Sequence, residues 1–308
     1  MDNGFILQDR IQKIQQIINK YGVDNFYMSY SGGKDSNVLS ALLDMAIPDN
    51  KIPRVFANTG IELNAVRDFV KAKAAGDNRI VIIKPATPIK KMLEAEGYPF
   101  KSKQHSEYLG IYYRNGIECK TIQKYLRRDP TVEKYFNEHC CPKKLEYQFA
   151  ENALDFKVSD KCCEELKVKP ITDWQNANKK PYKIIGIVEN EGGRRSFRHN
   201  GCLTFRHDKL KTFKPLYPVT KEWENWFINQ FNVDLPVVYY PPYNFARTGC
   251  KGCPFNKDLQ KDLDVLAEYF PNEHKQCEKI WAPVYAEYRR IGYRLRPMDE
   301  NQLSFFDE

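Results

Sequence analysis

The sequence lacks the features of a membrane or exported protein. No run of hydrophobic residues approaches the roughly 18 that a membrane-spanning helix requires. The first residues, MDNGFILQDRIQK, do not combine a positively charged start with an apolar middle, as a secretion signal would. We therefore expect a cytoplasmic protein with no membrane partner.

Internal repeats and low-complexity linkers are also missing. The chain has 308 residues, of which 42% are hydrophobic, so it is long enough to bury a sizeable core. We predict a main domain over residues 1–255, a helical extension over 256–296 and a flexible tail over 297–308.

Cysteine and positive charge, in contrast, are abundant. Nine cysteines are many for a chain kept in a reducing compartment, where clustered thiols usually bind metal or carry out redox chemistry. The formal net charge of +8 suits an anionic partner, either a small nucleotide or a nucleic acid, although a solvated basic surface would give the same value.

Short apolar strands alternate with amphipathic helices along much of the chain. Strands are predicted over residues 25–30, 54–58, 79–84 and 182–188. Helices are predicted over residues 7–18, 36–46, 59–75, 88–96, 121–128, 143–156, 221–231 and 258–290. Strands separated by helices at this interval indicate right-handed crossovers and parallel pairing. The expected fold class is α/β, with a mostly parallel sheet flanked by helices and a helical C-terminal extension.

The stretch SGGKDS lies between the first predicted strand and the helix that follows it. Gly32 and Gly33 would let the backbone approach a phosphate closely, and Lys34 would add a positive charge at a helix N-terminus. The loop differs from the common G-x-x-x-x-G-K-[ST] pattern, because its glycines are adjacent and Asp35 follows the lysine. An ordinary strand-to-helix turn is the alternative interpretation.

A second polar segment, ANTGIE, follows the strand over residues 54–58. It contains Asn58, Gly60 and Glu62, and Thr59 with Glu62 fits a capping box that would start the next helix. Ligands bind beyond the carboxyl ends of parallel strands, so SGGKDS and ANTGIE are expected at one crevice.

SGGKDS in this setting resembles the PP-loop of the ATP pyrophosphatase superfamily. That superfamily includes the phosphoadenylyl-sulfate (PAPS) and adenylyl-sulfate (APS) reductases, the small subunit of sulfate adenylyltransferase, tRNA-thiolating enzymes and the ATP pyrophosphatase of DNA phosphorothioation. The resemblance implies an adenine nucleotide α-hydrolase-like fold that binds ATP, APS or PAPS. The residues implied to hold the phosphates are Ser31, Gly32, Gly33, Lys34 and Ser36. Asp35 is implied to orient the loop, and Glu62, with Asn58 and Gly60 beside it, to face the adenosine or a Mg²⁺ ion.

The cysteines carry a second part of this resemblance. Cys162 and Cys163 in SDKCCEELK, together with Cys250 and Cys253 in RTGCKGCPF, are similar to the CC…C-x-x-C arrangement that holds a [4Fe–4S] cluster in APS reductases. A zinc ion or thiols without a metal are the alternatives. A second adjacent pair, Cys140 and Cys141, lacks the matching sequence around it.

Two further segments bear on the substrate. After the strand over 182–188, Glu191 and Arg195 match the family's pattern, with Arg195 as a candidate contact to phosphate or sulfate, but Val188 and Gly192 depart from that pattern. The C-terminal Glu-Cys-Gly-(Ile/Leu)-His motif of the reductases is absent, because no cysteine follows Cys277. The segment QLSFF, Gln302 to Phe306, resembles the short peptide by which bacterial proteins dock on the sliding clamp.

The expected function is that of a PAPS reductase family enzyme in sulfur metabolism or sulfur transfer. Lys34, Asp35 and Arg195 are its candidate catalytic residues. One alternative is an ATP pyrophosphatase that adenylates DNA or tRNA for sulfur modification. The other is a nucleotide-sensing protein without turnover, which would use the loop only to bind.

Overall fold

The computed structural model describes residues 2–128, 140–188 and 201–297, and its chain folds into two compact units. We call the first the sheet unit; it consists of residues 1–86 and 167–249. We call the second the helical unit; it consists of residues 87–166 and 250–308. Each unit is described separately. Among the described residues, no helix is both long enough and apolar enough to cross a membrane.

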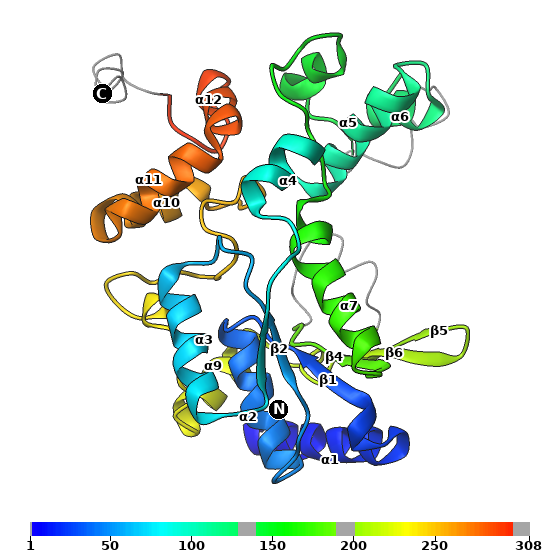
Figure 1. Cartoon of the computed structure of the whole chain (residues 1–308), viewed down its shortest axis with the longest axis vertical. Helices are drawn as coiled ribbons and strands as arrows, with labels where there is room; N and C mark the ends of the chain where they lie inside the picture. The colour runs from blue at the N-terminus through cyan, green and yellow to red at the C-terminus, as the bar shows by residue number, and fades with distance from the viewer. Residues whose placement is uncertain (1, 129–139, 189–200, 298–308) are drawn as a thin grey trace. The chain divides into compact units, whose positions relative to one another are not determined.

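The described residues of the sheet unit form a sheet of six strands in the order β3-β2-β1-β4-β6-β5 (Figure 1). The strands are β1 Phe26–Ser29, β2 Arg54–Ala57, β3 Ile80–Ile83, β4 Tyr182–Ile184, β5 Leu203–Arg206 and β6 Lys209–Phe213. All neighbouring pairs are parallel except β5 and β6, which form an antiparallel hairpin at one edge. The α/β fold with a mostly parallel sheet, predicted from the sequence, is confirmed.

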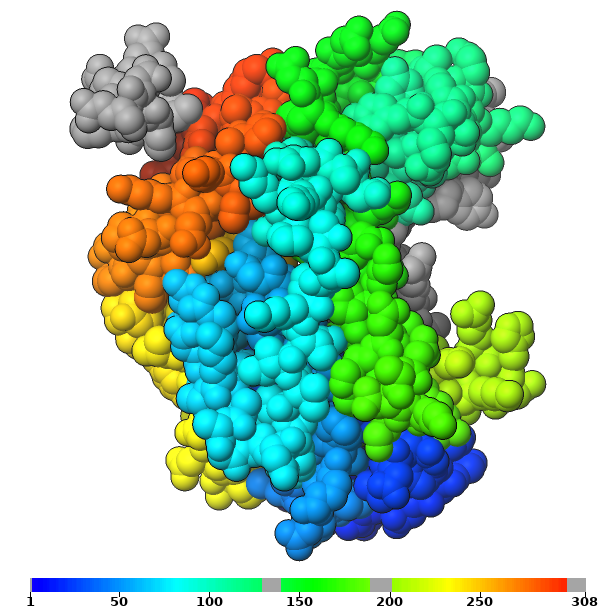
Figure 2. Space-filling view, in the orientation of Figure 1, coloured from blue at the N-terminus to red at the C-terminus, as the bar shows by residue number. Residues whose placement is uncertain are grey.

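The two faces of β1 bury different helices, as the alternation of side chains along a strand requires. Phe26 and Met28 join the main hydrophobic core, which also includes residues of α1 (Asn3–Tyr21), α2 (Lys34–Ala46) and α9 (Lys221–Gln230). Tyr27 points to the other face, where its hydroxyl donates to Gln175 of α7 (Lys169–Ala177) at 2.9 Å. No residue of α7 is fully buried, and Figure 2 shows this green helix open to solvent along one side.

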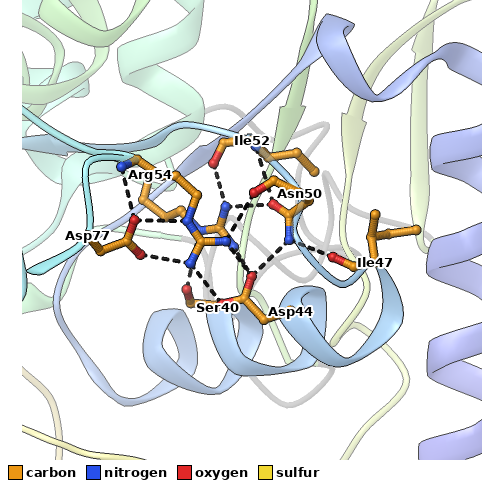
Figure 3. Close-up of polar contacts among 8 residues, drawn as sticks. Ser40, Asp44, Ile47, Asn50, Ile52, Arg54 and Asp77 are labelled. Carbon is orange, nitrogen blue, oxygen red and sulfur yellow. Dashed lines mark hydrogen bonds and ion pairs between the residues drawn. The ribbon is translucent and has the colours of Figure 1, made fainter.

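The C-terminal half of α2 is fastened to β2 by a buried arginine (Figure 3). The guanidinium of Arg54 is fully buried, lies 2.7 Å from the Asp44 carboxylate and donates to Asn50 at 2.8 Å. Arg79 pairs with the same Asp44 oxygen at 2.7 Å and with Asp77 at 2.8 Å. Because Asp44 belongs to α2, this network fixes the helix whose N-terminus carries SGGKDS.

The described part of the helical unit is mainly helical. Its helices are α4 Ile89–Glu96, α5 Lys103–Asn115, α6 Lys120–Tyr125, the 3-10 helix Lys143–Phe149, α10 Leu259–Tyr269, α11 Pro271–Ile280 and α12 Ala282–Arg290. His105 of α5 joins three of them, because its ring nitrogens lie 2.8 Å from the Tyr125 hydroxyl and 2.8 Å from Gln148 Oε1. Burial lowers the pKa of His105 to about 4, so this histidine is a neutral part of the core.

Several elements differ from the sequence-based predictions. The helix predicted over 143–156 is wrong, because a 3-10 helix ends at Phe149. The helix predicted over 258–290 is three helices, since Pro271 and Pro283 lack the backbone N–H that a helix interior needs and each lies in the first turn of a new helix. The strand predicted over 182–188 ends at Ile184. Helices α5 and α7 and the β5–β6 hairpin were not predicted.

The capping box predicted at Thr59 and Glu62 is also wrong. Helix α3 spans Asn64–Gly76 and therefore begins two residues after Glu62. The Glu62 carboxylate does accept from Thr59, at 3.0 Å from the backbone N–H and 2.6 Å from the hydroxyl, but these bonds close a turn that precedes the helix. The residue pattern was correct for the local contact and misplaced the start of the helix.

Candidate functional site

SGGKDS, which we call the phosphate loop, lies where the strand order of the sheet changes direction. Its strand, β1, pairs with β2 on one side and with β4 on the other. The chain therefore adds β2 and β3 on one side of β1 and then crosses to add β4 on the other side. Open α/β sheets bind their ligands at such a point, beyond the carboxyl ends of the strands. The loop joins β1 to α2, so the N-terminus of α2 faces this position.

The carbonyl groups of the loop are satisfied from its own helix. Asn37 donates to the carbonyl oxygens of Gly32 and Gly33, each at 2.9 Å, and the hydroxyl of Ser36 donates to Gly33 at 2.9 Å. Tyr30 in turn donates to Asn37 Oδ1 at 2.6 Å. With its carbonyls held against the helix in this way, the turn keeps its backbone N–H groups available to an acceptor.

Both glycines of the loop are required by close contacts. Gly32 has a φ of +70°, and a Cβ there would lie 2.5 Å from Val70 of α3. A Cβ on Gly33 would lie 2.9 Å from the Thr248 hydroxyl and 3.1 Å from the Tyr239 hydroxyl. A larger residue at either position would displace the loop.

Two backbone N–H groups of the loop donate hydrogen bonds to neutral hydroxyl oxygens. The N–H of Gly33 donates to Ser31 Oγ at 3.3 Å, and that of Lys34 donates to the hydroxyl of Tyr239 at 3.1 Å. The Tyr239 oxygen lies 2.6 Å from Thr248 Oγ1. Because these donors sit at the positive end of α2, an anionic oxygen is a stronger acceptor there than a hydroxyl.

The side chain of Lys34 remains beside the loop. Its ammonium group donates to Asn225 Oδ1 at 3.4 Å and lies 5.7 Å from the centre of the Tyr239 ring. Lys34 is partly exposed, so its charge can reach a ligand in solution. Together with the helix N-terminus, it makes the loop a cationic site.

Asp35, in the first turn of α2, is paired with a second acid. Glu224 of α9 shares a hydrogen bond with Asp35 and is only 2% exposed. Burial, followed by the charge of Asp35, raises the pKa of Glu224 to about 8. The predicted orienting role of Asp35 thus has a partner that the sequence did not reveal.

The ANTGIE turn closes on itself at the end of β2. Glu62 is 6% exposed; besides its bonds to Thr59, its Oε1 lies 3.8 Å from the ammonium group of Lys167. Gly60 has a φ of +81°, and its N–H donates to Asn58 Oδ1 at 3.1 Å. Since β1 and β2 are paired, this turn and the phosphate loop end adjacent strands, as expected.

The C-x-x-C pair of the helical unit lies on a firmly held turn, residues 250–254, which we call the cysteine turn. Trp281 donates to the carbonyl of Lys251 at 3.1 Å, Tyr285 to that of Gly252, and Tyr288 to that of Pro254 at 2.9 Å. The Lys251 ammonium group forms a buried ion pair with Glu273 at 3.1 Å. Cys250 and Cys253, which begin and end the C-x-x-C, are partly exposed.

The double cysteine lies at the start of the helical segment that leads into α7. Cys162 is 5% exposed and Cys163 is partly exposed. Within residues 2–128, 140–188 and 201–297, no three His, Cys, Asp or Glu side chains are grouped closely enough to hold a metal ion. The four predicted cysteines therefore do not form a ready ligand set for a cluster.

The other cysteine pair is buried, with Cys140 8% and Cys141 0% exposed. Burial raises the pKa of Cys141 to about 12, so its sulfur is a thiol and not the thiolate that binds metals. Glu191 and Arg195, as well as the Gln302–Phe306 segment, lie outside the described residues, so their predicted roles stay predictions.

The fold and the loop together describe an α/β domain with a glycine loop between its central strand and a helix N-terminus. A family model for the phosphoadenosine phosphosulfate reductase domain matches residues 25–256. The chain therefore belongs to the PAPS reductase domain family, and the resemblance noted from SGGKDS is confirmed.

Two curated proteins are similar in sequence. An uncharacterized protein of Methanocaldococcus jannaschii is 26% identical over 208 residues, which are 63% of this chain and 47% of that protein. A glutamine-hydrolyzing GMP synthase of Campylobacter fetus is 30% identical over 163 residues, which are 46% of this chain and 31% of the synthase. The chain thus spans less than half of the length of either relative.

Three solved structures are similar in fold, each with a TM-score of 0.40. The PAPS reductase of Candida auris is 13% identical, covering 73% of this chain and 82% of its own. The ammonia-dependent NAD synthetase of Campylobacter jejuni is 13% identical, covering 97% of this chain and 100% of its own. The U34-tRNA thiolase of Methanococcus maripaludis, with its [4Fe–4S] cluster, is 14% identical, covering 99% of this chain and 86% of its own.

Sequence reasoning missed four residues beside the phosphate loop, namely Glu224, Asn225, Tyr239 and Thr248. They lie about 190 to 215 positions after the loop, on α9 and on the segment that follows it. The sequence offered one signal for Glu224. This acid lies in the apolar stripe of α9, near Trp223 and Phe227, where a charged residue is unusual. No comparable signal marks Tyr239 or Thr248.

Proposed function

We propose that this chain is an enzyme that binds the phosphates of an adenylyl nucleotide, either ATP or an adenylyl sulfate, at the phosphate loop. The observation that carries the proposal is the contact between the Lys34 N–H and the Tyr239 hydroxyl at the N-terminus of α2. A neutral oxygen there occupies the place that a phosphate oxygen would take, beside a lysine ammonium group. Membership in the PAPS reductase domain family supports adenosine as the remainder of the ligand.

Each predicted site residue has a role in this proposal. Lys34 and the N–H groups of Gly32 and Gly33 stabilise charge on the phosphates, helped by the hydroxyls of Ser31 and Ser36. Asp35 orients the loop, and Arg195 receives the far anionic group. The residues proposed to shape the nucleotide side of the site are Asn58, Gly60, Glu62 and Glu191. Glu62 shapes the site by holding the turn that it forms with Thr59. A Mg²⁺ ion is an additional candidate ligand of the site.

The proposed chemistry is that of sulfur, as an enzyme of sulfur metabolism or sulfur transfer. The first form is action on an adenylylated sulfur compound. The second is release of pyrophosphate from ATP while DNA or tRNA is adenylated. The net charge of +8 suits a nucleic-acid partner and so favours the second form.

Product analysis separates these forms. Purified protein would be given ATP, with and without DNA or tRNA, and separately PAPS with a thiol reductant. Pyrophosphate release that depends on nucleic acid supports the adenylating enzyme, and sulfite release supports the reductase. Nucleotide binding with neither product would instead support the nucleotide-sensing protein.

A [4Fe–4S] cluster on Cys162, Cys163, Cys250 and Cys253 stays a prediction of the sequence, with zinc as the alternative. We assign it no step in the reaction. Anaerobically purified protein should absorb at about 400 nm if the cluster is present. The band should disappear in Cys250→Ser and persist in the matched variant Cys140→Ser. A colourless protein with one zinc ion per chain would contradict the cluster.

A further inference from the structure

A buried acid lies against the phosphate loop and has no place in the roles given above. Glu224 belongs to α9, which contacts α2, and its side chain is 2% exposed. The neighbouring Trp223 is equally buried, packs on Phe227 with ring centres 5.2 Å apart, and donates to the Asn3 carbonyl at 3.1 Å. Glu224 is therefore fixed in place and cannot turn outward to solvent.

The contact between Glu224 and Asp35 requires a proton. Two carboxyl groups can share a hydrogen bond only if one of them is protonated, because two carboxylates would repel each other without a donor between them. The protonated form suits the more deeply buried partner, since burial penalises charge. Asp35 lies in the first turn of α2, where the helix dipole favours a carboxylate.

The surroundings of one Glu224 oxygen support the same assignment. Glu224 Oε1 is buried, and no N–H or O–H group among the described residues donates a hydrogen bond to it. A bare, buried carboxylate oxygen would be costly, whereas the carbonyl oxygen of a neutral acid tolerates such a position far better. The geometry therefore fits a carboxylic acid that donates to Asp35.

We propose that Glu224 is a positioning residue that remains protonated at neutral pH, donates its hydrogen to Asp35 and so keeps the phosphate loop able to accept an anion. The proposal rests on the proposed function, in which the loop binds phosphate. In this state the two acids carry a single negative charge, and Lys34 with the α2 N-terminus dominates the local potential. Loss of the proton would place a second negative charge beneath the bound phosphate.

The charges around Glu224 define when this happens. Burial and Asp35 raise its pKa to about 8, whereas Lys34 on α2 and Lys221 on α9 act to lower it. Glu224 should therefore be neutral at pH 7 and ionised at pH 9, so the affinity of the loop for anions should fall between these values.

The first test measures pyrophosphate binding by calorimetry between about pH 7 and pH 9. For the wild type we expect roughly a tenfold loss of affinity across this range. Glu224→Gln keeps a hydrogen-bond donor to Asp35 but cannot ionise, so it should bind within about threefold of the wild type at pH 7 and lose far less affinity by pH 9. Ionisation of pyrophosphate itself is common to all the proteins and cancels in the comparison.

The matched control is Glu222→Gln, which removes a negative charge from the exposed side of the same helix. Glu222 has a lowered pKa, because it accepts a backbone hydrogen bond and one from Thr220, and is ionised throughout this range. Its variant should therefore keep the wild-type decline. A decline that is equal in the wild type and in Glu224→Gln would overturn the proposal.

The second test needs no ligand. The folded pKa of Glu224 is raised from an ordinary value of 4.5 to about 8, so Glu224 should favour folding fully below the lower value and lose this contribution as the pH rises to the upper one. Thermal unfolding should show that the wild type loses stability relative to Glu224→Gln over this interval and then levels off. Parallel stability curves for the wild type and Glu224→Gln would overturn the proposal, whether or not pyrophosphate binds. A failure of pyrophosphate to bind would, by itself, count only against the proposed function.

If Glu224→Gln fails to fold, infrared spectroscopy of the wild type alone can test whether Glu224 is protonated. The infrared C=O stretch of a protonated carboxyl should be present at pH 7 and disappear by pH 9. The half-buried Asp262 has a pKa raised to about 6 by burial, so it is ionised before this range begins. Absence of a carboxylic acid band at pH 7 would show that Glu224 is already ionised.

Discussion

The phosphate loop and the cysteine turn are both glycine turns held by tyrosine hydroxyls, but the hydroxyls contact opposite backbone groups. In the phosphate loop, the Tyr239 hydroxyl accepts a hydrogen bond from the N–H of Lys34. In the cysteine turn, Tyr285 and Tyr288 donate to the carbonyls of Gly252 and Pro254. The first arrangement places an exchangeable acceptor at a helix N-terminus, and the second saturates carbonyl oxygens inside a core.

This difference teaches how the two turns divide their tasks. A phosphate oxygen can replace the Tyr239 hydroxyl with a gain in electrostatic energy, so the phosphate loop is suited to bind and release a ligand. The carbonyls of the cysteine turn have donors that no solute can reach, so that turn is suited to hold its thiols in a fixed geometry. We therefore expect changes in the phosphate loop to act on binding and changes in the cysteine turn to act on stability.

The largest effect should come from breaking the buried ion pair of the cysteine turn. Lys251→Met leaves Glu273, which is 4% exposed, as a buried carboxylate without its cation and should cost about 3–5 kcal/mol of unfolding free energy. Urea unfolding followed by tryptophan fluorescence measures this cost. Lys257→Met, an exposed position nearby, is the matched control and should stay within about 0.5 kcal/mol. Equal stability of the two variants would show that the ion pair between Lys251 and Glu273 does not stabilise the folded protein.

The next effect should be a loss of binding at the phosphate loop. Lys34→Ala removes the charge beside the loop and should weaken pyrophosphate binding by about 10- to 100-fold with little change in stability. Calorimetry measures the affinity, and Lys20→Ala, an exposed lysine at the end of α1, serves as the control. A Lys34 variant that binds as the wild type does would refute the proposed site.

Removing the Tyr285 hydroxyl tests the structural turn. Tyr285→Phe leaves the buried carbonyl of Gly252 without its donor and should lower stability by about 1–3 kcal/mol. Denaturant unfolding is the measurement, and pyrophosphate affinity should be unchanged. Weaker pyrophosphate binding at full stability would reverse the division of tasks described above.

The smallest effect should come from the corresponding change at the phosphate loop. In the proposed binding mode the Tyr239 hydroxyl competes with the ligand for the Lys34 N–H, so Tyr239→Phe should bind pyrophosphate about 2- to 10-fold more tightly. Thr248→Val, which removes the hydroxyl partner of Tyr239, should shift affinity in the same direction by less. Weaker binding in Tyr239→Phe would mean that the hydroxyl contacts the ligand and does not compete with it.

Much of the sheet unit could be predicted because its information is local. The run FYMS before SGGKDS gave a strand and a turn, and the apolar spacing after it gave α2, since period and turn chemistry act over a few residues. Prediction failed where local patterns compete. Residues 143–156 have a helical pattern, yet only a 3-10 segment over Lys143–Phe149 forms, and Pro271 and Pro283 divide what looked like one helix.

By itself the sequence determined the α/β class, the phosphate loop with Gly32, Gly33 and Lys34, and the family, because each depends on residues close together in the chain. Only the tertiary structure decided what surrounds that loop. Tyr239, Thr248 and Glu224 reach it from segments that are distant in the sequence. The physical reason is that hydrogen bonds and buried charges depend on distance in space, which the order of residues does not record.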